Sequence, residues 1–468
     1  MSELKRVLGL WDIVAMNIVA VVGLRWITRS ARAGESSVTL WILAWLLFFL
    51  PLAAAVVELS SRHPEQGGLY AWTRRAFGPV HGFICGWCLW VNNLFYFPAL
   101  LLFAAANLLV LFGPAASGLT GSRFYAVTFV LVTLWGCVGL NLLGLGAGRL
   151  LQTAGSIATW TPAALLIVAG AVAFATVGSA STFSASTLLP RTDVLATISL
   201  WSAMCFAFSG VEIGGLVSEE VKDARRTIPR AILISGVTIT VIYIAGSASV
   251  LVAVPADTLK ELSGIADAVE HAGVQLGLAG MGALTGGMLA LGSIAGNNSW
   301  FGGAARVPFA AGVHDVLPPS FARLHPRHHT PVNALIMQGV AATAIFLLSL
   351  FVSITGGTTS IQEAYDILVN LTILVYFVPY LYLFPTLIRL RRLAGSDGHQ
   401  DVTRVPGGTP GLWLVATAGF LATATSIALV FVPPPDTVNV LNYEVNLIGQ
   451  SALVIGVGIA LYWWSTRR

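Results

Sequence analysis

Long apolar segments without charged residues dominate the chain. Residues 150–190 contain no Asp, Glu, Lys or Arg, and neither do residues 231–254. Because a helix rises about 1.5 Å per residue, each segment is long enough to cross a hydrocarbon core of about 30 Å. The apolar positions follow a helical period or are continuous, and do not alternate as they do in barrel strands. This pattern predicts an all-α, polytopic membrane protein.

The same test along the whole sequence predicts about twelve transmembrane helices. Residues 257–277 are too charged to span and are expected to form an amphipathic helix outside the membrane. Residues 394–410 are expected to be a cytoplasmic linker. The expected limits of the spans are 10–30, 37–60, 80–113, 123–145, 149–177, 194–218, 230–254, 279–304, 331–354, 364–390, 411–433 and 445–465.

Composition supports membrane insertion, and charge indicates an orientation. The 468 residues are 56% hydrophobic and only 10% charged, which is too little charge to cover a soluble protein of this length. Most Lys and Arg residues, including Arg62, Arg74 and Arg391, fall on the side of the N-terminus, whereas Lys260 falls on the other. The positive-inside rule therefore predicts that both termini are cytoplasmic, in a bacterial plasma membrane. The net charge of +4 belongs to the loops and does not indicate nucleic-acid binding.

Two of the expected spans are interrupted. "AVVGLRWI" at 20–27 places Gly23 near Arg25, and "FAFSGVEIGG" at 206–215 places Gly210 near Glu212. Unwound backbone persists at membrane depth only where it lines a cavity or is buried in protein, and charges there are costly. Each interruption lies in the first helix of a possible five-helix half, which is typical of inverted-repeat transporters with a midplane site. Alternatively, the glycines only allow neighbouring helices to approach closely.

Four stretches resemble the amino acid–polyamine–organocation superfamily of transporters, and the resemblance covers nearly the whole chain. The stretches are "LGLWDIVAMNIVAVVG" (8–23), "ELSSRHPEQGGLYAWTRRAFGPVHGFICGW" (58–87), "FAFSGVEIGGLVSEEVKDARRTIPRAI" (206–232) and "GGAARVPFAAGVHDVLPPSFARLHPRHHTP" (302–331). The resemblance implies a LeuT-like inverted repeat of five plus five helices, with helices 1 and 6 broken. The implied parts are a first repeat at 10–190, a second at 191–393, the linker 394–410, and two C-terminal helices in 411–468.

One departure from the family pattern concerns the first break. The family usually has Gly-Ser-Gly there, whose free amides hold a substrate α-carboxylate, but this chain has Gly23, Leu24 and Arg25. "VVGLRW", "GLYAWTRRAFGP" and "WCLWVNNLFYFP" are similar to the branch that contains glutamate/γ-aminobutyrate antiporters. The departure puts the usual carboxylate geometry in doubt.

Three hypotheses account for Arg25. Its guanidinium could pair with a substrate carboxylate, or it could take the place of a sodium ion. It could also be structural, neutralised by Glu212 or by carbonyls at helix ends. An unpaired cation at the midplane costs at least about 3 kcal/mol, so some partner is expected. Glu212 itself could sense protons or gate the site, or it could make a fixed hydrogen bond to unwound backbone.

Other candidate substrate-binding residues follow from the resemblance. Phe206 and Trp300 match positions where family members place aromatic gates, and Asn93 matches a polar position of the third helix. Ser209, Gly210 and Asn298 are further candidates, although Ser and Asn also join helices by hydrogen bonds.

Together these features predict a secondary active amino-acid transporter that works by alternating access. We expect an exchanger or a proton-linked carrier that needs no sodium, no metal and no cofactor. Alternatives are a sodium-coupled amino-acid carrier, a polyamine carrier, or a nutrient receptor on a transporter scaffold. A membrane-embedded enzyme would need a catalytic constellation within the spans, and the eight histidines all lie outside the midplane in this topology. The expected partners are an amino acid and the lipid bilayer, and the sequence carries no signal for an oligomeric state.

Overall fold

The computed structural model of the chain describes residues 9–63, 68–144, 148–190, 195–211, 221–306, 318–328, 330–351, 360–393, 402–433, 437 and 439–467. Within those ranges every regular element is a helix, which confirms the predicted all-α class.

The helices of the first part of the chain include a broken first span and a π-helical turn, Trp45–Phe49, inside the second. They are α1 (Leu10–Val21), α2 (Arg25–Ala31), α3 (Ser37–Ala44), α4 (Leu50–Arg62), α5 (Gly68–Phe77), α6 (Pro79–Phe112), α7 (Arg123–Leu142), α8 (Arg149–Thr176) and α9 (Ala185–Leu188). The later helices are α10 (Leu195–Ala207), α12 (Ala224–Ala253), α13 (Gly264–Gln275), α14 (Met281–Ala304), α16 (Val332–Phe351), α17 (Ile361–Leu393), α18 (Gly408–Val430) and α19 (Val440–Thr466).

Nine helical segments within the described ranges are long and apolar enough to cross a membrane. The eighth expected span, 279–304, forms the 24-residue helix α14. Its many glycines and its paired asparagines lower its hydropathy, so it is not among the nine. The first and sixth expected spans begin with α1 and α10, which are too short to cross alone because each is interrupted. The expected helix within 257–277 is α13.

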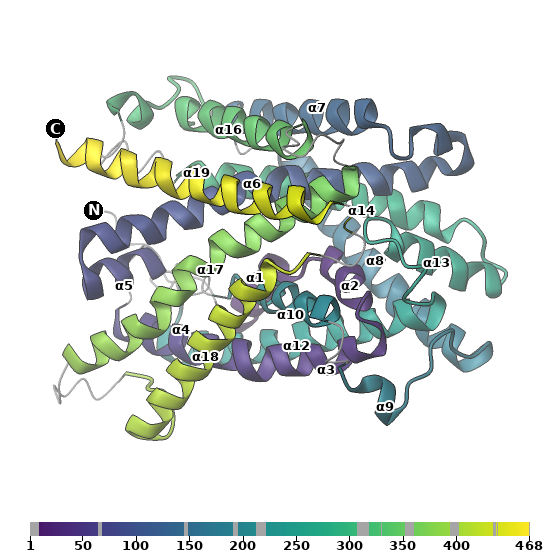
Figure 1. Ribbon diagram of the computed structural model, residues 1–468, viewed down its shortest axis with the longest axis horizontal. Coiled ribbons are helices and arrows are strands. Elements are labelled where there is room, and N and C mark those ends of the chain that lie inside the picture. The colour runs from purple at the N-terminus through teal and green to yellow at the C-terminus, as the bar shows by residue number, and fades with distance from the viewer. Residues whose placement is uncertain are drawn as a thin grey trace.

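Figure 1 shows how the helices are arranged around the two short ones, α2 and α10. Helix α10 packs against α2 and α18, and the long helix α6 packs against α14 and α17. Helix α5 and the C-terminal ends of α17 and α19 lie toward the left of Figure 1, whereas α9 and α13 lie toward the right. The molecule therefore has two ends, with α2 and α10 between them.

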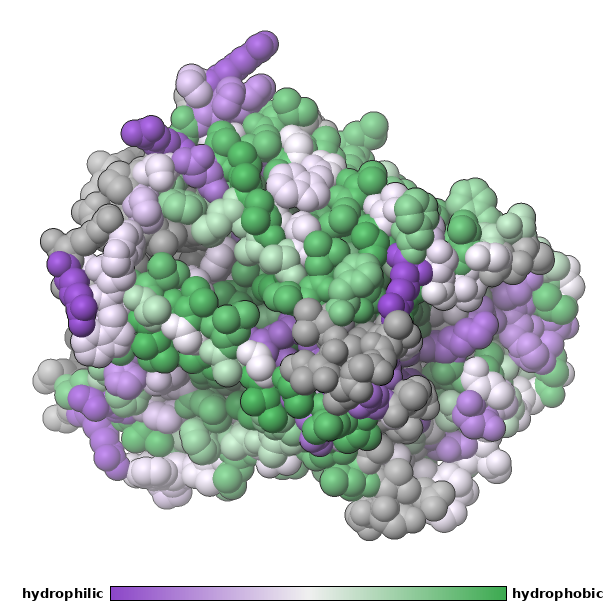
Figure 2. Space-filling view, turned by 45° about the horizontal axis from the view of Figure 1, so that its top comes forward, coloured by the Kyte–Doolittle hydropathy of each residue, from purple (hydrophilic) through white to green (hydrophobic). Residues whose placement is uncertain are grey.

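The outer surface is strongly apolar. Figure 2 shows broad hydrophobic areas, with hydrophilic residues along the margins and in a narrower band near the centre of the view. Soluble monomers rarely expose apolar patches of this extent, so the surface indicates contact with lipid. The most exposed large side chains include Trp11, Phe124, Leu150, Leu195 and Leu414.

Both interruptions expected from the sequence are present in the described residues. Helix α1 ends at Val21, Val22 is extended (φ −68°, ψ 108°), and α2 begins at Arg25. A β-carbon on Gly23 would lie 2.7 Å from Nε1 of Trp26, so a side chain does not fit there. Helix α10 ends at Ala207, and Gly210 has φ +106°, which favours glycine. Glu212 lies outside the described residues.

Candidate functional site

The guanidinium group of Arg25 lies between two aromatic rings at the first break. Its Cζ is 4.4 Å from the ring centroid of Trp26 and 4.5 Å from that of Tyr96 on α6. The residue is 3% exposed. Cation–π attraction of about 0.5–2 kcal/mol per ring compensates for part of the lost hydration. Among the described residues neither terminal nitrogen has a hydrogen-bond partner, so donors remain available to a ligand.

Further aromatic side chains surround this pair of rings. Phe206 on α10 packs edge-on against Trp26, with 5.2 Å between ring centroids. Trp300 on α14 lies 6.5 Å from Tyr96 by the same measure. The two residues expected as aromatic gates are therefore neighbours of the rings that contact Arg25. Their gating role stays a prediction.

The hydroxyl group of Tyr243 joins the two breaks. This α12 residue is fully buried. Its oxygen accepts a hydrogen bond from the backbone N–H of Gly23 at 3.1 Å. The hydroxyl also lies within donating distance of the carbonyl oxygens of Val21, at 3.0 Å, and Ala207, at 3.2 Å. One side chain thus lies within hydrogen-bonding distance of backbone groups freed by the ends of both α1 and α10.

The remaining expected residues lie at different places around the breaks. Leu24 is buried beside Arg25, and the buried hydroxyl of Ser209 has no partner within the described ranges. The Asn93 side chain donates to the carbonyl oxygen of Leu89 in its own helix, at 2.9 Å. The Asn298 side-chain oxygen accepts from Asn141 on α7, at 3.0 Å, so this amide joins two helices.

Tyr96, Trp26 and Tyr243 were not among the residues expected from the sequence. Tyr96 follows Asn93 by three residues and so lies on the same face of α6, a spacing that could have indicated it. Trp26 is adjacent to Arg25 in the sequence. Tyr243 lies in an apolar segment about 220 residues from Gly23, and nothing in the local pattern distinguishes it.

A second buried arginine on α2, Arg29, has its own set of partners, which we call the Arg29 cluster: Arg29, Arg32, Glu261, Asp366 and Asn370. Arg29 Nη1 is 2.5 Å from Glu261 and 2.8 Å from Asp366, and its Nη2 donates to Asn370 at 3.0 Å. Arg32 pairs with the other oxygen of Glu261. The cluster ties α2 to α17 and to the loop before α13.

The charge balance of the cluster follows from these contacts. Burial by itself would raise the pKa of the Glu261 carboxyl group. The two neighbouring guanidinium groups, Arg29 and Arg32, outweigh that effect and hold the pKa below its ordinary value. Glu261 is therefore held as a carboxylate, and it keeps both arginines paired.

A third charged group, which we call the Glu58 cluster, consists of Glu58, Arg62 and Arg391 and involves the C-terminal end of α17, which lies toward the left of Figure 1. The fully buried Glu58 on α4 accepts from Arg62 at 2.8 Å and from Arg391 at 3.3 Å. It also accepts from the backbone N–H of Val405 at 2.8 Å. These contacts join α4, the C-terminal end of α17 and the segment before α18.

Over the part of the chain that the structure describes, no group of three or more His, Cys, Asp or Glu side chains is placed to hold a metal ion. The four cysteines, Cys85, Cys88, Cys137 and Cys205, are buried free thiols.

Comparison with protein families and known proteins gives a consistent result. A family model described as amino acid permease matches residues 8–459. An uncharacterised transporter of Legionella pneumophila is 31% identical over 97% of this chain and 96% of its own length. A probable agmatine/putrescine antiporter of Lactococcus lactis is 25% identical, covering 79% and 78% of the two chains. A glutamate/γ-aminobutyrate antiporter of the same species is 24% identical, covering 84% and 77%.

Among solved structures, that of MhsT in complex with L-phenylalanine superposes with a TM-score of 0.58. The superposition covers 92% of this chain and 99% of the MhsT chain, and the two sequences are 16% identical. At that identity the likeness concerns the fold, which agrees with the predicted LeuT-like arrangement.

Proposed function

The chain belongs to the amino acid permease family, and on that premise we propose that it exchanges amino acids across the membrane by alternating access, without sodium. Family members are transporters, and the relatives described above include antiporters. Three details of this transport are also proposed: which residues hold the solute, whether an ion is involved, and how the two ends open. The first two are argued from the geometry around Arg25, and the third from the two charged clusters.

The observation that carries the proposal is the buried guanidinium of Arg25 beside the rings of Trp26 and Tyr96, whose two terminal nitrogens have no hydrogen-bond partner among the described residues. A buried cation without a partner is costly, and a carboxylate accepting two parallel hydrogen bonds is the geometry that a guanidinium matches best. An amino acid supplies such a carboxylate. Ser209, whose hydroxyl is also unpartnered within the described ranges, is a further candidate contact.

Sodium independence is proposed from the same residue. Carriers of this architecture coordinate sodium with oxygen ligands near the unwound parts of their helices. Arg25 puts a permanent positive charge at the first break, and a guanidinium stays charged at every physiological pH. A sodium ion beside it would be repelled, so the arginine takes over the ion's electrostatic role toward the substrate.

Alternating access is proposed to act through the two charged clusters. Arg25 is 3% exposed, so a solute reaches it only after side chains move. The Arg29 cluster joins α2 to α17 and to the loop before α13, whereas the Glu58 cluster joins α4 to the C-terminal end of α17. We assign the first to closure of the outer side and the second to closure of the cytoplasmic side, each separating when its side opens.

One relative is described as a probable agmatine/putrescine antiporter, whose named solutes are cations, whereas another is described as a glutamate/γ-aminobutyrate antiporter. Arg25 disfavours a polyamine because two cations would meet in a poorly solvated site. The proposed substrates are therefore amino acids with a free carboxylate, and putrescine serves as the negative comparison.

Counterflow in proteoliposomes tests the proposal directly. Vesicles loaded with one unlabelled amino acid should accumulate the same labelled amino acid in sodium-free buffer, across a panel of acidic and neutral amino acids. Putrescine should not drive accumulation. Arg25→Ala should abolish counterflow, whereas the exposed-site control Arg323→Ala should keep it. Ligand binding by Arg25→Ala at wild-type affinity in sodium-free buffer would refute both the carboxylate and the sodium-surrogate roles.

The orientation, with both termini cytoplasmic, is also a proposal. It can be tested by single cysteines, since the four native thiols are buried and should react slowly. Lys260→Cys should react with an impermeant reagent only from outside, and Arg226→Cys only from inside. Reaction of residue 260 from the cytoplasmic side alone would overturn the topology.

A further inference from the structure

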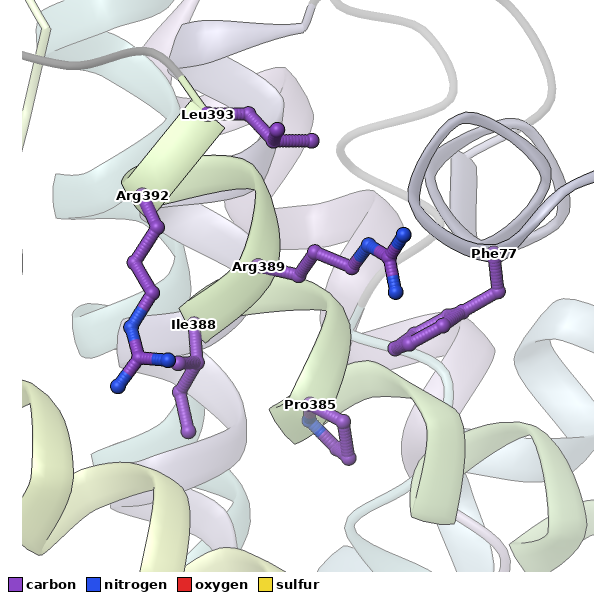
Figure 3. Close-up of a pocket in the computed structure, with 6 residues that line it drawn as sticks. All are labelled: Phe77, Pro385, Ile388, Arg389, Arg392 and Leu393. Atoms are coloured by element: carbon purple, nitrogen blue, oxygen red, sulfur yellow. The ribbon is translucent and has the colours of Figure 1, made fainter.

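A cavity of 460 Å³ opens between α5 and the C-terminal end of α17. Figure 3 shows its lining, which combines apolar side chains with two arginines. Because Leu393 ends the candidate span formed by α17, the cavity lies where that helix leaves the hydrocarbon core. The lining residues are Phe77, Pro385, Ile388, Arg389, Arg392 and Leu393.

Two arginines of the lining have no ion-pair partner among the residues that the structure describes. Arg389 extends toward Phe77 in Figure 3, and its Cζ is 5.1 Å from the centroid of that ring. Arg392 leaves α17 on the other side, where its Cζ lies 5.4 Å from the ring centroid of Trp413 on α18. Neither has a carboxylate partner among the residues that the structure describes, and both are exposed. Their neighbour Arg391, in contrast, is paired with Glu58.

The apolar part of the lining is continuous with the lipid-facing surface. Pro385 and Ile388 lie one turn or less from Arg389 on α17, and Leu393 is 68% exposed. Trp413, 45% exposed, is the kind of side chain that gathers at membrane–water interfaces. A free anion would contact only the arginines, whereas a molecule with an anionic head and an acyl chain would contact both the charged and the apolar part.

We propose that this cavity binds an anionic phospholipid, with its phosphate at Arg389, the start of an acyl chain along Pro385, Ile388 and Phe77, and Arg392 adding positive charge on the neighbouring side of α17. Basic pockets between helices at the membrane surface favour anionic headgroups, and a guanidinium can donate two parallel hydrogen bonds to one phosphate. The lipid would join α5 to α17. The proposed orientation places it in the cytoplasmic leaflet, but the binding itself does not depend on transport.

The test is a lipid titration of the full-length protein in detergent, followed by native mass spectrometry. The probes are phosphatidylglycerol, phosphatidylcholine with the same acyl chains, and soluble glycerol 3-phosphate. Phosphatidylglycerol should bind the wild type in preference to both others. Arg389→Ala/Arg392→Ala should weaken that binding about 30-fold, from about 1 kcal/mol per arginine. Arg389→Gln alone, a milder change, should weaken it about fivefold.

Arg323→Ala/Arg327→Ala is the matched control, because it removes the same charge from an exposed loop elsewhere. It should bind phosphatidylglycerol as the wild type does. An equal loss in this control would overturn the proposal in favour of general surface attraction. Equal binding of phosphatidylcholine, or glycerol 3-phosphate binding as tightly as the lipid, would also overturn it. The readout is lipid binding and not transport. A protein that binds no lipid here could still exchange amino acids, and a protein without exchange activity could still bind the lipid.

Discussion

Arg25 and Arg29 lie one helical turn apart on α2 and are equally buried, each with 3% of its surface exposed, but they differ in their partners. Both terminal nitrogens of Arg29 bond to Glu261, Asp366 or Asn370. Within the described ranges neither terminal nitrogen of Arg25 has a partner, and its guanidinium faces two rings instead. The contrast separates an arginine that holds helices together from one that remains available to a ligand.

Arg25 and Arg29 differ in their partners because different elements pack against the two turns of α2. Arg25 contacts the rings of Trp26 and Tyr96, and Phe206 of α10 and Trp300 of α14 lie beside those rings. No carboxylate pairs with Arg25 among the described residues. At Arg29 the neighbours are the loop before α13 and the polar face of α17, where Asp366 and Asn370 follow a helical spacing of four residues. One turn of α2 therefore separates Arg25, the proposed substrate contact, from the Arg29 cluster, the proposed closure of the outer side.

The largest effect is expected from removing the paired arginine. Arg29→Ala leaves two buried carboxylates without their main counter-charge, which should lower the free energy of unfolding by about 3–5 kcal/mol. Thermal unfolding in detergent measures this change. Neutralising the acids as well, in Arg29→Ala/Glu261→Gln/Asp366→Asn, should restore part of the stability. A single mutant as stable as the wild type would show that the cluster contributes no net stability.

Removing Arg25 should change ligand binding strongly and stability little, the reverse of what is expected for Arg29. Arg25→Ala is expected to weaken amino-acid binding by about 100-fold or more, since it removes two charge-assisted hydrogen bonds, and to leave the unfolding temperature nearly unchanged. Arg25→Lys should recover binding only partly, because an ammonium group lacks the planar fork. Ligand-dependent thermal shifts report both quantities in one experiment.

The same variant also tests Glu212 as the alternative partner. If Arg25 pairs with Glu212, Arg25→Ala should destabilise the protein by about 3–5 kcal/mol unless the acid becomes protonated. Arg25→Ala/Glu212→Gln should then recover stability. In that case Arg25 and Arg29 would both be paired with buried carboxylates, and the contrast between them would disappear.

A smaller effect is expected at the residue that joins the breaks. Tyr243→Phe removes the hydroxyl that contacts Gly23, Val21 and Ala207, and should cost about 1–3 kcal/mol of stability. The matched control is Tyr125→Phe, whose half-buried hydroxyl bonds only to the carbonyl oxygen of Ala105 in the part of the chain described. Chemical or thermal unfolding should show a larger loss for Tyr243→Phe. Equal losses would mean that joining the breaks adds nothing beyond one hydrogen bond.

The smallest effect is expected from the rings around Arg25. Phe206→Leu and Trp300→Leu keep apolar bulk but remove ring contacts worth about 0.5–1.5 kcal/mol, so exchange should slow by up to about tenfold. The control is Phe301→Leu. Phe301 lies in the same helix as Trp300, but its buried ring packs on Phe97. Wild-type exchange rates in both Phe206→Leu and Trp300→Leu would return these residues to a packing role.

The sequence was sufficient to predict the helical class, the approximate spans, and the two interruptions. These properties are local, because hydropathy over some twenty residues decides insertion, and a glycine beside a charge marks a break within the same segment. The family resemblance rests likewise on contiguous motifs. Gly23, Arg25, Phe206 and Gly210 could be named for that reason before any contact was visible.

The partners of those residues required the folded molecule. Glu261 and Asp366 lie 232 and 337 positions from Arg29, and Tyr243 lies 220 positions from Gly23. Asn298 could be named from the sequence, but its amide bonds to Asn141 of α7. Burial makes every polar group depend on whichever helix packs beside it, and helix packing joins segments that are remote in the chain. For that reason the sequence pointed to Arg25 and not to Arg29. Only the packed neighbours show that Arg29 is paired, whereas the terminal nitrogens of Arg25 have no partner within the described ranges.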